Sequence, residues 1–255
     1  LWTLALLGCV WLLAAGNLCA EESEVVAEPL FSADQLEQLV APIALYPDSL
    51  VAQILMASTY PLEIVQAARW REDHVELEGD ALEQELADQN WDPSVKALTN
   101  FSDLLTRMND NLDWTQDLGD AVLAQEGEVM DAIQRMRHLA KDAGNLETTK
   151  EQKVIVEEKI IVVEPAAEVV YVPAYSPTVV YGSYWAPATW YYPFYGYPRT
   201  YWYPPGYAAS NLISFSIGVA VGAAIWRNWN WGRCDWRRGG VTINNNFNFS
   251  RNINT

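Results

Sequence analysis

The sequence contains little histidine, little cysteine and few basic residues. Only 2 His and 3 Cys occur in 255 residues, which nearly excludes zinc and iron–sulfur sites that need several such ligands. The 16 Lys and Arg stand against 33 Asp and Glu, and a net charge of -17 argues against nucleic acid, because a phosphate backbone requires a basic face. Catalytic motifs such as Ser-His-Asp, a Gly-rich phosphate loop or paired cysteines are also lacking. We expect no cofactor, no metal and no catalytic residue.

Charge and aromatic rings are distributed unevenly along the chain. Residues 1–164 carry 31 acidic and 10 basic side chains, whereas residues 165–255 carry 2 acidic and 6 basic ones. Most of the 12 Trp and 13 Tyr lie in the second region. Hydrophobic residues make up 50% of the chain, which is enough for one core of ordinary domain size. The chain therefore joins an acidic front part to a basic, aromatic rear part.

The N-terminal stretch Leu1–Cys19 is an apolar run without a charged residue. Small residues at its end and an acidic stretch after it are typical of a secretory signal peptide. We predict a signal peptide over residues 1–20, cleaved after Ala20 or alternatively after Gly16, and a linker over residues 21–31. The prediction implies an exported protein.

Other interpretations of this stretch are a lipidated Cys9 or a retained membrane anchor. If Cys9 and Cys19 leave with the signal peptide, Cys234 remains as a single thiol. A single thiol in an oxidising compartment is expected to be buried or paired between chains.

Helix signals recur at short intervals over residues 32–146. Ser32 and Gln35 form a capping-box pattern, and Asp48 is placed to cap a helix over residues 49–58. Pro61 favours the first turn of a helix that runs to about Trp70 and presents Leu62, Val65 and Arg69 to its neighbours. Further helices are predicted to begin at Asp80, at Asp92-Pro93 and at Asp113, the last extending to His138 as one or two helices. Short connections favour antiparallel packing of adjacent helices.

The predicted fold class is mainly α, with a compact multi-helix domain over residues 32–146. A small β-unit follows over residues 147–182, because short runs rich in Val and Ile alternate with Glu, Pro and Ser breaks. These runs lie at residues 154–156, 160–163, 169–172 and 179–181. The remaining C-terminal region is predicted to be aromatic, Gly- and Asn-rich low-complexity sequence.

Several long blocks resemble the bacterial domain-of-unknown-function family 3300. The blocks are ALYPD at 44–48, QILMASTYPLEIV at 53–65, AARW at 67–70, WDPSVKAL at 91–98, WTQDLGDA at 114–121, AIQRMR at 132–137, AGNL at 143–146 and VVYVPAYSP at 169–177. The resemblance covers residues 33–182. It implies exported, envelope-associated proteins of Gram-negative bacteria, in the periplasm or at the outer membrane. It implies no activity, and it assigns no catalytic residue to this chain.

The densest polar and aromatic cluster of the helical domain includes Tyr46, Asp48, Tyr60 and Glu63. One interpretation is a pocket between two helices with Glu63 as an acid or base. The other is turn and cap chemistry, with the tyrosines packed against the core and their hydroxyls hydrated. Trp70 is a further candidate interaction residue. We expect His74 and His138 to lie on solvated surface, and the acidic run 76–88 to be an amphipathic helix rather than a calcium site.

An aromatic and proline-rich tract follows, with 15 aromatic residues and 7 prolines in residues 171–207. Prolines disfavour regular strand pairing there. One interpretation is a display of rings that stack on sugars, aromatic partners or lipid headgroups, and the other is a tract that lies over the protein's own surface. The candidate interaction residues are Tyr171, Tyr175, Tyr181, Trp185, Trp190, Tyr195 and Trp202. The tract proper is assigned to residues 183–209.

Residues 210–226 form an apolar, Gly-rich segment without charge until Arg227. As a helix, the 16 residues 211–226 would span about 24 Å, short of the roughly 30 Å of a bilayer core. Membrane spanning therefore stays the lesser alternative to glycine-mediated helix packing.

The tail over residues 227–255 is predicted to be disordered. Its Trp229, Trp231 and Trp236 alternate with arginines, a mixture that favours lipid headgroups or anionic glycan as partners. Its Asn-rich end has potential for self-association.

Together these features predict an exported, non-enzymatic interaction or structural module of the cell envelope. Its partner would be an envelope glycan, lipid surface or protein, with contact through the aromatic rear part. Two alternatives remain at this point. One is a hydrolase or transferase acting on envelope polymer through a carboxylate in the Tyr46–Glu63 cluster. The other is a short membrane-anchored protein held by Leu212–Trp226.

Overall fold

A computed structural model describes residues 29–166, 169–182, 185, 187, 189, 213–215, 219–220 and 232–243. The predicted signal peptide, most of the linker, most of the aromatic tract and the Asn-rich end lie outside the described residues. The same holds for five of the candidate interaction residues: Trp190, Tyr195, Trp202, Trp229 and Trp231.

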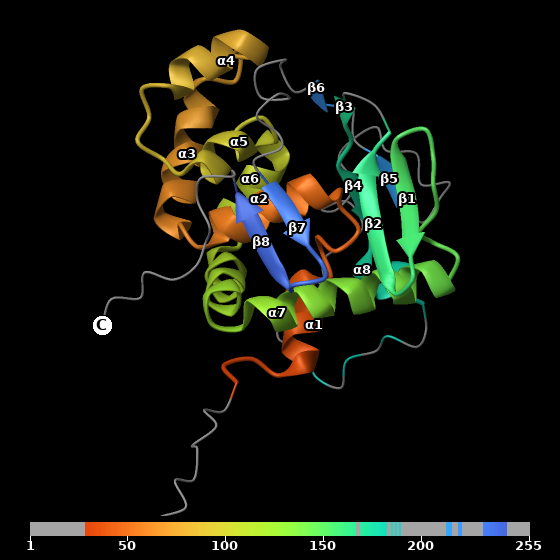
Figure 1. The fold of residues 1–255 in the computed structure, drawn as a ribbon. Coiled ribbons are helices and arrows are strands. Elements are labelled where there is room, and N and C mark those ends of the chain that lie inside the picture. The colour runs from red at the N-terminus through yellow and green to blue at the C-terminus, as the bar shows by residue number, and fades with distance from the viewer. Residues whose placement is uncertain are drawn as a thin grey trace, which may run out of the picture.

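The predicted helical domain is confirmed, and the fold is mainly α (Figure 1). Its helices are α1 (Ala33–Val40), α2 (Asp48–Ser58), α3 (Pro61–Asp73), α4 (Gly79–Leu86), α5 (Pro93–Leu98), α6 (Ser102–Asp110) and α7 (Leu112–Asp142). The helix α6 was not predicted. In α7, Gln125 has a non-helical backbone conformation. Its side chain accepts a hydrogen bond from Phe31 N and donates one to Phe31 O. The predicted stretch from Asp113 is therefore one long helix with a kink.

The observed helix starts can be compared with the predicted N-cap residues. The capping box of Ser32 and Gln35 is present, and Asp92 accepts a bond from Ser94 N as the cap of α5. The prediction for Asp48 is wrong, because Pro47 is the N-cap of α2 and Asp48 is the first helical residue. Pro47 starts the helix without a side-chain bond. The carboxylate of Asp48 is thereby free to reach other elements.

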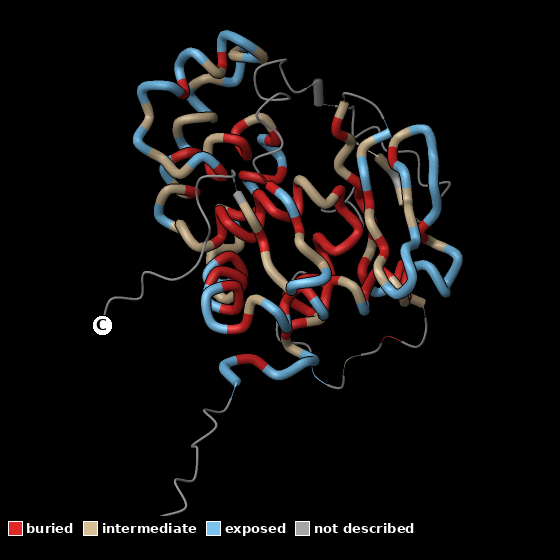
Figure 2. Tube along the Cα trace, in the orientation of Figure 1, coloured by how far each residue is buried: buried red, intermediate tan, exposed pale blue. Residues whose placement is uncertain are grey.

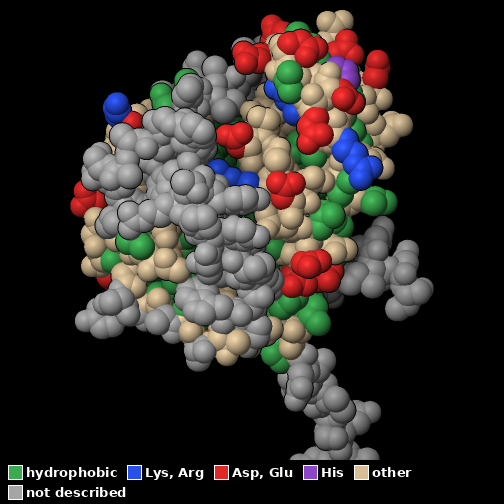
Figure 3. Space-filling view, turned by 180° about the vertical axis from the view of Figure 1, so that it is seen from behind, with side chains coloured by type: hydrophobic (Ala, Val, Ile, Leu, Met, Phe, Trp, Pro, Cys, Tyr) green, Lys and Arg blue, Asp and Glu red, His purple; other side chains and the backbone are tan. Residues whose placement is uncertain are grey.

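The helix α2 lies at the centre of the helical domain and is buried on every side (Figure 2). The helix α3 buries Ile64, Ala67 and Ala68, whereas Leu62 is 72% exposed, so the predicted contact face of α3 is wrong. The helix α4 confirms the amphipathic prediction, with Leu82 and Leu86 buried. Acidic side chains gather at this end of the molecule (Figure 3).

Short antiparallel strand pairs complete the described structure. The strands β1 (Gln152–Glu157) and β2 (Ile160–Pro165) form a hairpin, and β7 (Gly232–Asp235) and β8 (Gly240–Ile243) form another. The remaining two pairs join distant segments: β3 (Val169–Val170) with β6 (Val219–Ala220), and β4 (Pro173–Tyr175) with β5 (Ile213–Phe215).

These strands correct three predictions. Residues 179–181 are not a strand, because α8 (Pro177–Val180) begins at a proline that favours the first helical turn. The described parts of the apolar segment, 213–215 and 219–220, are strands rather than helix. Residues 232–243 form a hairpin rather than a disordered tail, because Cys234 and Val241 are buried against the helical core. Within the described ranges, no helix has the length and apolarity needed to cross a membrane.

The hairpin β7–β8 lies across α2 and near the kink of α7 (Figure 1). A side chain at Gly232 would meet Gln53 and Ala52 of α2 within 3.0 Å, so only glycine allows this close approach. On the other strand, Val241 N donates to Glu126 of α7 at 2.7 Å. These contacts hold the β7–β8 hairpin against α2 and α7.

Candidate functional site

Asp48 joins three elements at the start of α2. Its Oδ1 accepts bonds from Arg137 Nη1 of α7 at 2.7 Å and from Val163 N of β2 at 3.1 Å. Its Oδ2 accepts a bond from the indole Nε1 of Trp236, which follows β7, at 2.6 Å. Both carboxylate oxygens are therefore used in holding α7, β2 and the β7–β8 hairpin together.

Arg137 is fully buried, and its charge is neutralised inside the protein. Besides Asp48, its guanidinium donates to Ala44 O and Ile161 O at 2.8 Å each and to Tyr46 O at 3.0 Å. Its Cζ lies 4.7 Å from the centroid of the Trp236 ring, a distance typical of a cation–π contact. A buried cation with this many acceptors is satisfied rather than available to a ligand.

A group of buried aromatic residues holds the segment that precedes α2. The hydroxyl of Tyr175 donates to Ala41 O at 2.9 Å and accepts from Leu45 N at 3.3 Å, and the Tyr181 hydroxyl donates to the same Ala41 carbonyl. Burial raises the pKa of Tyr175 well above its usual value, as does the neighbouring Tyr181. The buried members of the group are Tyr46, Tyr175, Tyr181 and Trp185. These four rings are packed inside the protein, so an external ligand does not reach them, while Tyr171 is half-buried.

The rest of the predicted cluster lies at the other end of α2. Glu63 accepts a bond from Asp92 N at 2.6 Å, and the pKa of Tyr60 is raised by partial burial and by the carboxylates of Asp92 and Glu63. The 11 residues of α2 separate this end from Asp48 by about 16 Å. A single pocket that contains both Asp48 and Glu63 is therefore not formed.

Trp70 lies in a small aromatic group at this second end. Its ring stacks on His74 with centroids 4.3 Å apart and meets Trp91 edge-on at 5.9 Å. His74 also contacts Trp70 O, and His138 contacts Lys159 O at 2.8 Å, so both histidines are half-buried rather than solvated. Among the described residues, no group of three or more His, Cys, Asp or Glu side chains is placed to hold a metal ion.

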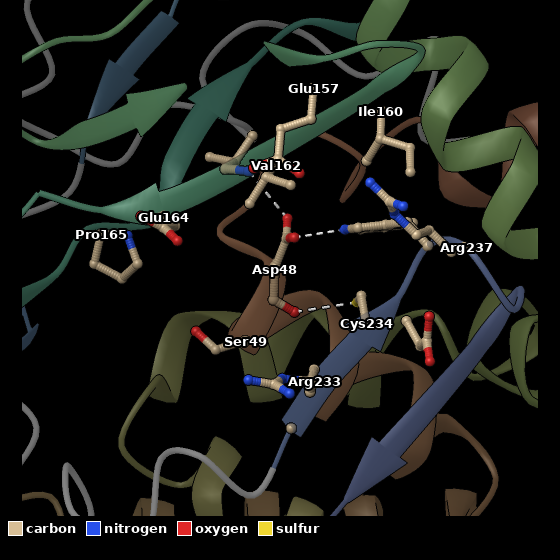
Figure 4. A pocket seen from close by; sticks show the side chains of 14 residues that line it. Asp48, Ser49, Glu157, Ile160, Val162, Glu164, Pro165, Arg233, Cys234 and Arg237 are labelled. Carbon is tan, nitrogen blue, oxygen red and sulfur yellow. Dashed lines mark hydrogen bonds between the residues drawn. The ribbon is translucent and has the colours of Figure 1, made fainter. Parts of the chain in front are cut away.

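A cavity of about 590 Å³ opens between β2 and β7, with the start of α2 as part of its wall (Figure 4). Its volume falls within the roughly 300–1,000 Å³ of small-ligand sites. It is lined by Asp48, Ser49, Glu157, Ile160, residues 162–165 and residues 232–237. Figure 4 shows Arg233 on the Ser49 side of Asp48 and Arg237 on the Ile160 side.

Cys234 in the cavity wall is buried and is the free cysteine of the described residues. Its Sγ lies 3.4 Å from Asp48 O. Burial raises the pKa of this thiol well above its usual value, and the carboxylate of Asp48 adds to the effect. A thiol that stays protonated is a poor nucleophile, so the buried alternative of the sequence prediction holds and the cavity contains no activated cysteine.

Sequence reasoning named Trp236 and Asp48 but missed the arginine that connects them. A signal was available, because Arg137 falls on the apolar row of α7 that contains Met130, Ile133 and Ala140 at helical spacing. A charged residue on such a row requires a buried partner. The other missed residues, Glu157 and Glu164, come from the β1–β2 hairpin, and nothing in their local sequence places them opposite β7.

Comparison with known proteins agrees with the resemblance noted in the sequence. The family described as "Protein of unknown function (DUF3300)" matches residues 32–255. The chain is 40% identical over 244 aligned residues to the "Uncharacterized protein YacH" of Escherichia coli (strain K12). The alignment covers 81% of this chain and 38% of that protein, so the chain spans less than half the length of this relative. No solved structure matches.

Proposed function

Because the chain belongs to the DUF3300 family of proteins of unknown function, we propose a function from its own geometry: an exported, non-enzymatic interaction module of the cell envelope. The observation that carries this proposal is the open cavity between β2 and β7. Its wall combines an indole, aliphatic side chains and charged groups, a composition that suits a small polar ligand.

The hydrogen bonds of Asp48 favour binding over catalysis. A general base has to move toward the substrate proton and take it. Asp48 already accepts three bonds, from Arg137, Val163 N and Trp236, which fix its position between three elements. The other carboxylate considered, Glu63, lies outside the cavity lining. Asp48 is therefore better suited to hold the wall of the cavity together than to transfer a proton.

Export is supported by the apolar run Leu1–Cys19, which is followed by acidic sequence. It is also consistent with Cys234, whose burial protects a single thiol from oxidation. We place the protein in the periplasm or at the outer membrane of a Gram-negative bacterium. There the ligand of the cavity would be an envelope component.

Subcellular fractionation of the native host tests this location. The protein should appear in the periplasmic or outer-membrane fraction, and recovery in the cytosol would contradict the proposal. Retention of the purified full-length protein on washed envelope sediment tests the interaction. A variant truncated after residue 165 is unsuitable as a control for this retention, because it lacks Tyr175, Tyr181 and Cys234, which belong to the hydrophobic core.

A pair of point variants provides the control for retention. Arg237→Glu changes the charge of the cavity wall, whereas Arg69→Glu makes the same change at an exposed residue of α3 outside the lining. The proposal predicts weaker retention of Arg237→Glu than of Arg69→Glu. Equal retention of the two variants would refute a role of the cavity.

A further inference from the structure

We infer that the cavity between β2 and β7 binds an anionic saccharide. The sugar ring would lie against the exposed part of Trp236, and its carboxylate or phosphate would pair with Arg233 or Arg237. This inference rests on the proposed function and names the ligand class of the same site. Four observations support it: the ring of Trp236, the mixture of polar groups, the two arginines of the wall and the occupied edge of β2.

Trp236 is held by the protein on one face and is partly open to the cavity. The buried guanidinium of Arg137 covers one face at 4.7 Å. Trp236 is nevertheless partly exposed and lines the cavity, so a ligand can reach part of its ring. Ile160 and Val162 provide apolar surface in the same cavity. The C–H face of a pyranose ring suits such a flat apolar surface.

The polar groups of the wall are of two opposite kinds. The carboxylates of Glu157 and Glu164 only accept hydrogen bonds, whereas the guanidinium groups of Arg233 and Arg237 only donate them. A ligand that satisfies both kinds needs groups that donate and accept. Hydroxyl groups do so, and a sugar carries several of them around one ring.

The wall contains four carboxylates and two arginines, Arg233 and Arg237. Asp48 is neutralised by the buried Arg137, whereas Glu164 with Lys153 and Asp235 with Arg238 form longer, solvent-exposed ion pairs. No ion pair joins Arg233 or Arg237 to another residue that the structure describes. These two arginines are therefore the groups of the wall that would bind an anionic group. Arginine pairs well with carboxylate and phosphate, often through two parallel bonds.

The free edge of β2 is not available to an added peptide strand. Its outward N–H groups are occupied, since Ile161 N donates to Gln134 Oε1 and Val163 N to Asp48 Oδ1. The carbonyl of Ile161 accepts from both Gln134 and Arg137. Strand addition requires a row of unpaired backbone groups. These side chains take the place of a neighbouring strand, which favours a compact ligand over an extended peptide.

Calorimetric titration of the full chain tests the inference with matched ligands. Methyl β-glucuronoside is compared with methyl β-glucoside, and glucose 6-phosphate with glucose and with inorganic phosphate. We expect at least one acidic sugar to bind about tenfold more tightly than its neutral counterpart, as charge-assisted hydrogen bonds require. Inorganic phosphate alone should bind more weakly than glucose 6-phosphate, because it lacks the ring that contacts Trp236.

The double variant Arg233→Gln/Arg237→Gln should lose this preference for the acidic sugar. Both side chains are exposed, so the fold should remain intact. The control Arg69→Gln/Arg135→Gln removes the same charge at residues outside the cavity lining and should keep the preference. The inference is overturned if no sugar binds, if inorganic phosphate binds as tightly as glucose 6-phosphate, or if both double variants behave alike. Retention on envelope sediment without sugar binding would overturn this inference but leave the proposed function standing.

Discussion

Arg137→Met is the substitution that most directly tests how the site is held together. Methionine has a similar length but no charge, so Asp48 Oδ1 loses its cation. The carbonyls of Ala44, Tyr46 and Ile161 lose a donor at the same time. The site would then contain an unpaired, largely buried carboxylate and unsatisfied carbonyl groups.

The expected loss of stability is large. Breaking a buried ion pair by removing one partner costs about 3–5 kcal/mol. Because a domain of this size loses about 2–4 °C in Tm per kcal/mol, the midpoint should fall by roughly 10 °C. The matched control is Arg135→Met on the same helix. Arg135 pairs with Glu37 at 2.9 Å but is 44% exposed, so its removal should cost less than about 1 kcal/mol.

Urea unfolding followed by far-ultraviolet circular dichroism measures both variants. A double-mutant cycle with Asp48→Asn separates the ion pair from the lost packing, because asparagine keeps the shape of Asp48 and removes its charge. The coupling energy should be at least about 2 kcal/mol, within the range for residues in contact. If Arg137→Met and Arg135→Met lose equal stability, the reasoning that places Arg137 at the centre of the site is refuted.

Three further predictions follow from other parts of the structure. A Cβ at Gly119 of α7 would lie 2.3 Å from Ser58 O, so Gly119→Ala should destabilise the protein by about 1–3 kcal/mol in urea unfolding. At Gly127 the added Cβ would lie 3.9 Å from Gly239 O, an ordinary van der Waals contact, so Gly127→Ala should stabilise the protein by about 0.5–1 kcal/mol; equal signs would contradict the packing. Cys234 should react with a thiol reagent only as fast as the protein unfolds, and rapid labelling of the native protein would contradict its burial. Stability should fall as the pH rises above about 9 and more steeply above about 10, because Cys234 and Tyr175 keep in the folded state a proton that they lose in the unfolded chain. Tyr175→Phe should reduce the fall in urea midpoint above pH 10, and an unchanged slope there would show that another group is responsible.

The helical part of the fold was predictable because its signals are local. Ser32 with Gln35, Pro61 and Asp92 with Pro93 each mark a helix start within a few residues, and all three starts are confirmed. Asp48 misled, because its residue type suits a cap while its carboxylate forms bonds with residues about 90 to 190 positions away. A local signal contains no information about such distant partners.

The strands and the site were less predictable for the same reason. The strand β3 pairs with β6, and β4 pairs with β5, across about 40 to 50 residues of sequence. The glycines and apolar residues of the segment that contains β5 and β6 suit a helix equally well. The hairpin β7–β8 follows a basic, Trp-rich stretch that has the composition of a disordered tail. Its order comes from tertiary contacts, chiefly Gly232 against α2 and Trp236 against Asp48.

The central claim is that an envelope component occupies the cavity between β2 and β7. Site-specific photo-crosslinking in the living host tests this claim most directly. The crosslinking residue replaces Val162 in the cavity wall. As a control it replaces Leu123, which is 50% exposed on α7 and lies outside the lining. We predict an adduct with envelope material from position 162 and none from position 123. Equal adducts from both positions, or none from position 162, would contradict the account.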